Sequence, residues 1–247
     1  YLGKVGLEKK YESAMKGKRG VRTIEVDVFG NQIRELSRTL PERPLDLFLS
    51  LNLSLQKLAK KELSDRKGAI IAIDPNTGFI KALVSSPDYN PNILNKTEKG
   101  SLYPKIQEKN APLFNRAISG SYPPASTIKP FLGLLGLEER AIDENTIIND
   151  EGFFQINGEG RKYRGWKEEG HGEVNLKKAI VESSDVYFYE LATKLTIDKI
   201  SNFLGTFNFG KNTGIDLINE IPSVLPDRNW KLGNIGESWF VGDTVNM

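Results

Sequence analysis

Cysteine is absent from this chain of 247 residues, and histidine occurs once, as His171. Without cysteine the chain has no disulfide, no thiolate ligand for a metal and no cysteine nucleophile. Any Ser-His-Asp triad would have to use the lone histidine. Because His171 lies between two glycines in a charged loop, we interpret it as a residue that holds a turn.

Long apolar runs and an excess of one charge are also missing. No stretch approaches the roughly 20 apolar residues of a membrane span, so we expect neither a membrane span nor a signal peptide within these residues. The 34 basic and 32 acidic residues leave a net charge of +2, and without a dense basic stripe we expect no nucleic-acid partner. Since the chain starts at Tyr1 and not at methionine, we expect a piece of a longer protein from which an anchor was removed.

The polar, glycine-rich beginning of the chain predicts a small module that buries little by itself. We expect residues 1–65 to form this N-terminal pedestal and its linker. Strict alternation over residues 21–28 is typical of a half-buried strand. The predicted elements are a helix over 6–15, strands over 21–28, 32–36 and 45–51, and a helix over 53–63.

Residues 66–247 are expected to form a second, larger domain. A hairpin is predicted around Pro75-Asn76-Thr77-Gly78, whose residue types suit a turn. The other predicted elements are helices over 126–140, after Asn175, over 185–195 and over 197–205, with a surface loop over 87–112, a long excursion over 143–173 and an irregular tail from 219. Because strands and helices segregate more than they alternate, an α+β fold with an antiparallel sheet is favoured.

The most informative stretch is Ser126-Thr127-Ile128-Lys129. On a helix, residues three apart share a face, so the Lys129 amine can reach the Ser126 hydroxyl and take its proton. Pro130 is tolerated only if the helix begins near Ser126. That places Ser126 where serine caps well and the helix dipole favours an alkoxide. The apolar run that follows predicts a buried helix, so burial would make Lys129 a better base.

Ser-x-x-Lys alone is weak evidence, because it also occurs at Ser13/Lys16, Ser54/Lys57 and Ser64/Lys67. Those three matches lie in mixed-charge surroundings typical of solvated helix faces. For Ser126 the alternative is an ordinary N-cap serine with an exposed lysine. A second polar cluster, Ser183-Ser184-Asp185, precedes an aromatic helix and in isolation is also typical of an N-cap.

Together the two clusters resemble the signatures of the penicillin-binding serine transferases, Ser-x-x-Lys followed by Ser-x-Asn or Ser-x-Asp. Within them the chain is most similar to the class B transpeptidases of cell elongation. The similarity runs along nearly the whole chain and includes residues 3–8, 74–78, 115–117, 122–130, 170–172 and 213–217. It implies a penicillin-binding (β-lactamase-like) transpeptidase fold, with an antiparallel sheet flanked by helices.

The resemblance implies the role of each motif residue. Ser126 would attack the penultimate D-alanine of a peptidoglycan stem peptide, with Lys129 as the base. Ser183 would relay the proton to the leaving amine, and Asp185 would hold the lysine and the substrate amide. A neighbouring stem peptide would resolve the acyl-enzyme into a cross-link, and penicillin and other β-lactams would acylate Ser126 and stall there.

The third signature of that family, Lys-Thr-Gly or Lys-Ser-Gly, does not occur in this sequence. Asn76-Thr77-Gly78 and Asn212-Thr213-Gly214 lack the cation and are typical of turns. In relatives the motif lies well beyond the equivalent of residues 239–244, so we expect this chain alone to be inactive.

The resemblance also implies partners and a location. The implied partners are the elongation scaffold protein MreC and the SEDS-family glycan polymerase RodA. The implied location is the bacterial inner membrane, with the domain anchored there and facing the periplasm. No cofactor is expected. Some relatives bind zinc through carboxylates, a histidine and a cysteine, but Gly165 and Ser184 stand where two ligands would be needed beside Asp150 and His171, so no metal is expected. The alternatives are a serine β-lactamase or carboxypeptidase of the same fold, and a non-catalytic binding or sensor module.

Overall fold

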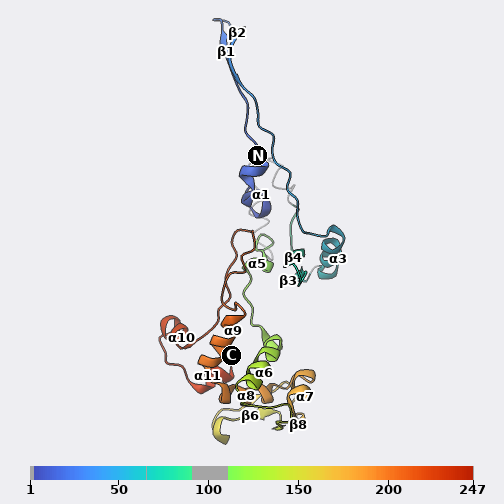
Figure 1. Cartoon of the computed structure of the whole chain (residues 1–247), viewed down its shortest axis with the longest axis vertical. Coiled ribbons are helices and arrows are strands. Elements are labelled where there is room, and N and C mark those ends of the chain that lie inside the picture. The colour runs from blue at the N-terminus through green and yellow to red at the C-terminus, as the bar shows by residue number, and fades with distance from the viewer. Residues whose placement is uncertain (1–2, 65, 91–110, 247) are drawn as a thin grey trace. The chain divides into compact units, whose positions relative to one another are not determined.

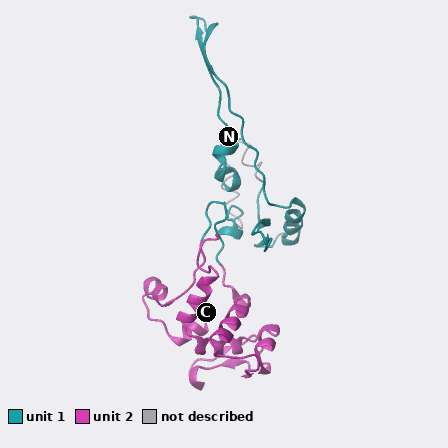
Figure 2. Cartoon of the chain, in the orientation of Figure 1, with its two compact units in different colours: residues 1–121, 214–221 teal, residues 122–213, 222–247 magenta. Residues whose placement is uncertain are grey.

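The structure is a computed structural model that describes residues 3–64, 66–90 and 111–246. The chain forms two compact units, one of Tyr1–Ser121 with Gly214–Ile221 and one of Tyr122–Thr213 with Pro222–Met247 (Figure 2). Within the described ranges, no helix has the length and apolar character needed to cross a membrane. The sheets in these ranges are all two-stranded and antiparallel. Helices and antiparallel sheets therefore form the predicted α+β fold.

The first unit begins with two short helices and an antiparallel hairpin (Figure 1). Helices α1 (Gly6–Lys10) and α2 (Glu12–Met15) replace the single predicted helix, and strands β1 (Val21–Val26) and β2 (Gln32–Thr39) are confirmed. The Asp27 carboxylate closes the turn by accepting from the Phe29 and Asn31 amides, at 2.9 Å each. The half-burial expected over 21–28 is wrong, because every residue of β1 except Glu25 is exposed, and β2 is exposed along its whole length. Alternation of apolar and polar residues gives a strand one apolar face, but that face is buried only if another element packs against it.

Helix α3 (Leu53–Leu63) packs on the second hairpin, β3 (Gly68–Ile73) and β4 (Ile80–Ser86), both as predicted. The small core between them consists of Ala59, Leu63, Ala82 and Val84. The predicted strand over 45–51 is wrong, because that segment forms no ladder. The chain instead meets β4 through single contacts, the Ser50 hydroxyl to the Ile80 carbonyl and the Asn52 amide to the Lys81 carbonyl, each 2.8 Å. A further short helix, α5 (Arg116–Ser119), is capped by Asn115.

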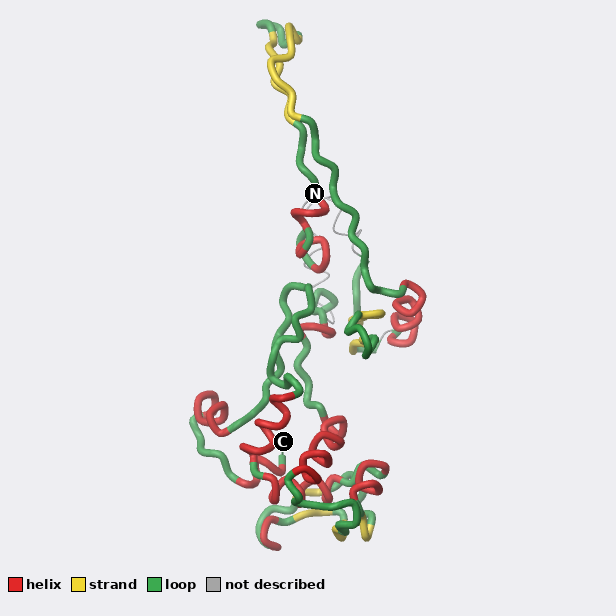
Figure 3. Tube along the Cα trace, viewed as in Figure 1, coloured by secondary structure: helices red, strands yellow, loops and turns green. Residues whose placement is uncertain are grey.

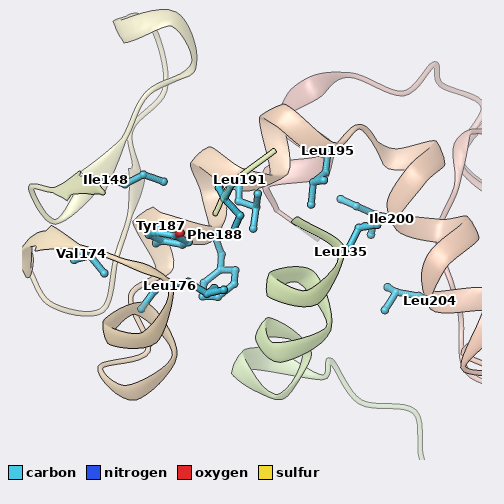
Figure 4. Close-up of a cluster of buried hydrophobic side chains, with 12 residues drawn as sticks. Leu135, Ile148, Val174, Leu176, Tyr187, Phe188, Leu191, Leu195, Ile200 and Leu204 are labelled. Carbon is cyan, nitrogen blue, oxygen red and sulfur yellow. The ribbon is translucent and has the colours of Figure 1, made fainter. Parts of the chain in front are cut away.

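Helices supply most of the hydrophobic core of the second unit (Figure 3). They are α6 (Lys129–Glu138), α7 (Leu176–Val181), α8 (Asp185–Leu195) and α9 (Ile197–Thr206). Side chains of α6, α8 and α9 point toward one another around Leu135, Leu195 and Ile200 (Figure 4). Gly133 and Gly136 permit close packing of α6, since a Cβ on either would lie 2.9 Å from Leu176 or Ile142. The helices over 185–195 and 197–205 are confirmed.

The excursion over 143–173 contains strands that the sequence did not predict. Strand β5 (Ile148–Asp150) pairs with β8 (Gly172–Val174), and β6 (Phe153–Phe154) pairs with β7 (Tyr163–Arg164). A 3-10 turn, η3 (Ile156–Gly158), lies between β6 and β7.

The irregular tail predicted from residue 219 is wrong in part, because it contains α10 (Arg228–Ile235) and α11 (Val241–Val245). Helix α10 begins at the Asp227 cap and ends at Gly236, whose φ of 80° suits glycine. The predicted surface loop lies mostly outside the described residues.

Candidate active site

Ser126 lies in a single 3-10 turn, η2 (Ala125–Ile128), that leads directly into α6. Pro130 is accommodated in the first turn of α6, as predicted. The expected capping role of Ser126 is wrong, because neither η2 nor α6 has a side-chain cap. The Ser126 hydroxyl instead accepts a hydrogen bond of 2.8 Å from the Ser183 hydroxyl, 57 residues further along the chain.

Lys129 is only 7% exposed, although it is charged and begins a helix. Its Nζ donates to Asp185 Oδ1 at 2.6 Å, to the Ser183 carbonyl at 2.8 Å and to Ser183 Oγ at 3.1 Å. These three acceptors match the three donors of an ammonium group. The alternative of an exposed lysine beside a capping serine therefore does not hold.

The connection between the amine and the nucleophile runs through Ser183. Lys129 Nζ lies 3.1 Å from Ser183 Oγ, and Ser183 Oγ lies 2.8 Å from Ser126 Oγ. The sequence predicted direct contact within the Ser-x-x-Lys turn, whereas the described contacts form a three-membered chain that includes the second motif. A proton can move along such a chain by transfer between adjacent heteroatoms.

The backbone around the two serines is strained. Ser183 has a φ of 54° and Ala125, the residue before Ser126, has a φ of 50°. Each such conformation costs about 1–3 kcal/mol for a residue with a side chain and is retained where surrounding contacts enforce it. At Ser183 those contacts are the bonds from Lys129 to its carbonyl and hydroxyl.

Asp185 opens α8, and the residue before it, Ser184, is the N-cap that accepts from the Tyr187 amide at 3.2 Å. The N-cap interpretation of this cluster is thus correct for Ser184, while its two neighbours face Lys129. Asp185 uses both carboxylate oxygens, Oδ1 for Lys129 and Oδ2 for the Trp166 amide at 3.1 Å. The site brings together all four residues that the sequence singled out.

Sequence reasoning missed Trp166. Its indole Nε1 lies 3.2 Å from the carbonyls of both Glu182 and Ser183, while its backbone amide binds Asp185. The only sequence signal was an aromatic residue in a glycine-rich loop, which does not distinguish this position from any exposed tryptophan.

His171 does not contact Ser126 in the described structure and instead pairs with Asp150 through Nδ1, at 2.7 Å. Asp150 Oδ2 also accepts from the Ser184 hydroxyl at 2.6 Å, and Oδ1 from the Gly152 amide at 2.8 Å. Burial raises the pKa of the Asp150 carboxyl, but the hydrogen bonds from Ser184, His171 and Gly152 outweigh burial and hold that pKa below its ordinary value. Asp150 is therefore ionised at neutral pH.

The residues around Asp150 do not fit a zinc site. In the described part of the chain, no three His, Cys, Asp or Glu side chains gather where they could hold a metal ion. The imidazole and the carboxylate are bonded to each other, Ser184 contributes a neutral hydroxyl, and Gly165 has no side chain. A tetrahedral zinc site needs four nitrogen, sulfur or carboxylate ligands.

A serine linked to a buried lysine through a second serine, at the start of a helix in an α+β unit, defines an active-serine site of the lysine-dependent class. A family model described as penicillin binding protein transpeptidase domain matches residues 68–246, and one described as penicillin-binding protein dimerisation domain matches residues 1–49. The chain belongs to the penicillin-binding protein transpeptidase family.

Among curated relatives, the peptidoglycan D,D-transpeptidase MrdA of Acinetobacter baumannii is 43% identical over 250 residues, which cover 100% of this chain and 37% of that protein. The MrdA of Escherichia coli is 38% identical and covers 99% of this chain and 39% of that protein. The chain thus spans about two fifths of the length of these relatives.

Solved structures of the same family are similar to this one. Penicillin-binding protein PBP2 of Helicobacter pylori, solved in complex with MreC, matches with a TM-score of 0.87 and 38% identity, covering 99% of this chain and 45% of that one. Pseudomonas aeruginosa PBP2 in complex with WCK 5153 matches with a TM-score of 0.84 and 34% identity, covering 100% of this chain and 52% of that one.

Proposed function

We propose that this chain is part of a peptidoglycan D,D-transpeptidase that cross-links stem peptides ending in D-Ala-D-Ala through an acyl-enzyme on Ser126. The single observation that carries the proposal is the chain of hydrogen bonds from Lys129 through Ser183 to Ser126. It supplies an activated nucleophile without histidine.

In the acylation step, Ser126 Oγ forms a bond to the carbonyl carbon of the penultimate D-alanine. Lys129, in its uncharged form, takes the serine proton through Ser183, and the same proton returns through Ser183 to the leaving nitrogen. The amide bond breaks and terminal D-alanine departs as an amine. Asp185, bonded to the lysine at 2.6 Å, holds the amine in place.

In the second step, an amine of a neighbouring stem peptide attacks the ester carbonyl, and Ser126 recovers its proton as the new amide forms. The Ser126 amide would be one oxyanion donor, an interaction worth about 3 kcal/mol in serine hydrolases. The other donor and the site for the substrate carboxylate require the Lys-Thr-Gly or Lys-Ser-Gly motif, which this sequence does not contain.

The test is mass spectrometry of the full-length protein after incubation with penicillin. We expect one stable adduct on the peptide that contains Ser126, and no adduct in Ser126→Ala. An adduct on another residue would refute the proposal. Rapid release of hydrolysed penicillin would indicate a β-lactamase or carboxypeptidase, and growth on full-length Ser126→Ala as the sole copy would indicate a non-catalytic module.

Residues 1–247 alone should acylate very slowly or not at all, because half of the oxyanion hole is missing. Fluorescent penicillin followed by denaturing electrophoresis measures this directly, with the full-length protein as the positive control. Labelling of the 247-residue chain at the full-length rate would contradict this expectation.

We further propose that residues 1–65 form the pedestal, that 66–247 belong to the transpeptidase domain, and that the protein is anchored in the inner membrane and faces the periplasm. MreC and RodA are the proposed partners, supported for MreC by the complex of the Helicobacter pylori relative. The tip of the first hairpin supports a docking role, since Val28 is 92% and Phe29 86% exposed. Phe29→Asp should weaken MreC binding in a pull-down and leave penicillin acylation unchanged.

A further inference from the structure

A second polar network lies beside the site and has no part in the proposed reaction. Its centre is Asp150, which is 2% exposed and accepts three hydrogen bonds, from Ser184 Oγ, His171 Nδ1 and the Gly152 amide. Ser184 is fully buried at 0% exposure. A buried carboxylate is retained only when hydrogen bonds replace its lost hydration, and Asp150 meets that condition.

The donor in the hydrogen bond between His171 and Asp150 follows from the state of the carboxylate. Asp150 is ionised, so it has no proton to donate, and Nδ1 of His171 must carry the hydrogen of the 2.7 Å bond. Nε2 is buried and has no hydrogen-bond partner among the described residues.

The backbone is shaped to close around Asp150. Gly152 has a φ of 84° and Gly170 a φ of 72°, and a Cβ on either would lie 2.0 Å from a carbonyl oxygen, that of Glu168 or of Asp150. Only glycine permits such an approach. The end of β5 and the start of β8 are thereby held together, with Asp150 paired to Gly172 in the ladder.

The network reaches the catalytic turn at two points. Ser184 stands between Ser183 and Asp185, so its bond to Asp150 fixes the middle of the turn. Trp166 packs its ring against His171, with centroids 5.4 Å apart, and donates to the Ser183 carbonyl and to Asp185 Oδ2. Lys129 donates to the same Ser183 carbonyl and to the other oxygen of the Asp185 carboxylate, Oδ1.

We propose that Asp150, His171 and Ser184 form a metal-free hydrogen-bonded support that positions Ser183 and Asp185 for the acylation of Ser126, an inference that rests on the proposed function. They are positioning residues, since none of them touches Ser126 or Lys129 in the described contacts. A metal ion bound by suitable ligands could fix three segments of the chain around one point. Here the hydrogen bonds to Asp150 do this instead. Displacement of a reacting group by about 1 Å can cost about 100-fold in rate, so the support matters for chemistry as well as stability.

The test compares Ser184→Ala with Asp227→Ala in the full-length protein. Each substitution removes one helix N-cap of the second unit, at α8 and at α10, where Asp227 accepts from the Trp230 amide at 2.6 Å. Only Ser184 also binds Asp150. We expect Ser184→Ala to lower the Tm at least as much as Asp227→Ala, because it also removes a hydrogen bond from the buried Asp150 carboxylate. The acylation rate constant at saturating fluorescent penicillin should fall about tenfold or more in Ser184→Ala and stay within about twofold in Asp227→Ala.

Three further measurements separate positioning from damage to the fold. Ser184→Ala should still reach complete labelling at Ser126, and its apparent affinity before acylation should be unchanged. Asp150→Asn, which keeps an acceptor for the Ser184 hydroxyl, should acylate faster than Asp150→Ala. If Ser184→Ala acylates as fast as Asp227→Ala, the positioning role is refuted while the proposed function stands. If the parent protein is not labelled at Ser126, the proposed function itself fails.

Metal content tests the remaining part of the inference. The purified protein should hold far less than one zinc per chain by elemental analysis, and prolonged treatment with EDTA should change neither Tm nor acylation rate. One tightly bound zinc whose removal lowers the Tm would overturn the metal-free support.

Discussion

The hairpin of β1 and β2 and the helix α8 represent opposite ways of ordering a chain. In the hairpin, backbone pairing and the Asp27 turn define the structure, while every side chain of β2 is exposed. In α8, six of eleven residues are buried, and Tyr187 and Leu191 are inaccessible to solvent. Packing therefore determines where α8 lies, and the backbone determines the hairpin.

This difference agrees with where we propose that each kind of function lies. Catalysis needs atoms held to a fraction of an ångström, and Asp185 begins a helix in which six residues are buried. A surface that binds a partner needs exposed side chains and tolerates motion. The exposed apolar side chains of the hairpin, such as Ile33 and Leu36, agree with the docking role that we propose for it.

The largest predicted effect is on the acylation rate and comes from substituting Lys129, the buried lysine of the candidate active site. Lys129→Met keeps most of the length of the side chain but removes the amine that we propose as the base, so acylation should fall by at least about 100-fold. Lys199→Met is the matched control, because Lys199 pairs with Glu139 at 2.6 Å, the same distance as Lys129 to Asp185, but at the surface. Stopped-flow fluorescence with a penicillin reporter measures both variants. Equal rates in the two would show that Lys129 is only a structural partner of Asp185.

The second-largest effect is predicted for a substitution in the hydrophobic core, and it is a loss of folding stability. Leu191→Ala removes a side chain that is fully enclosed by the hydrophobic cluster of the second unit. We expect a loss of about 2–5 kcal/mol in the free energy of unfolding. The matched change in the hairpin, Leu36→Ala, should stay within about 0.5 kcal/mol because that side chain is exposed.

Urea titration monitored by tryptophan fluorescence follows the second unit, since Trp166, Trp230 and Trp239 all lie in it. Hydrogen exchange of the β1 amides follows the hairpin. A large loss of protection in Leu36→Ala would mean that the hairpin has a side-chain core after all.

The same contrast explains what the sequence could predict. The helices α8 and α9 were predictable, because apolar periodicity is a local signal. Spacing placed Lys129 near Ser126, but the convergence of Ser183 and Asp185 on them was implied only by the resemblance of the two motifs to the family signatures. The alternation over 21–28 predicted strands correctly but not their exposure, because exposure depends on what else packs there. The segment over 45–51 has a strand-like pattern, but it and the adjoining Asn52 meet β4 through isolated hydrogen bonds and form no ladder with it.

The candidate site differs from the prediction where contacts between residues distant in sequence determine the hydrogen-bond partners. Ser126 does not cap its helix because Ser183, distant in sequence, bonds its hydroxyl. Trp166 contributes mainly through a backbone amide and an indole N–H, for which its sequence context has no signature. Helix α10 is a different case, since the Asp227 cap and Gly236 were visible signals of its two ends.

The smallest predicted effect is in the hairpin, where Glu25 and Arg34 are direct cross-strand partners and form an ion pair. Their side chains are 41% and 70% exposed, so solvent screens the pair. A double-mutant cycle with Glu25→Ala and Arg34→Ala should give a coupling of about 0.2–1 kcal/mol that shrinks as salt is raised. Hydrogen exchange of the β1 and β2 amides supplies the free energies. A coupling above about 2 kcal/mol that resists salt would place the pair in a buried environment, and the hairpin would then be ordered by its side chains, as α8 is.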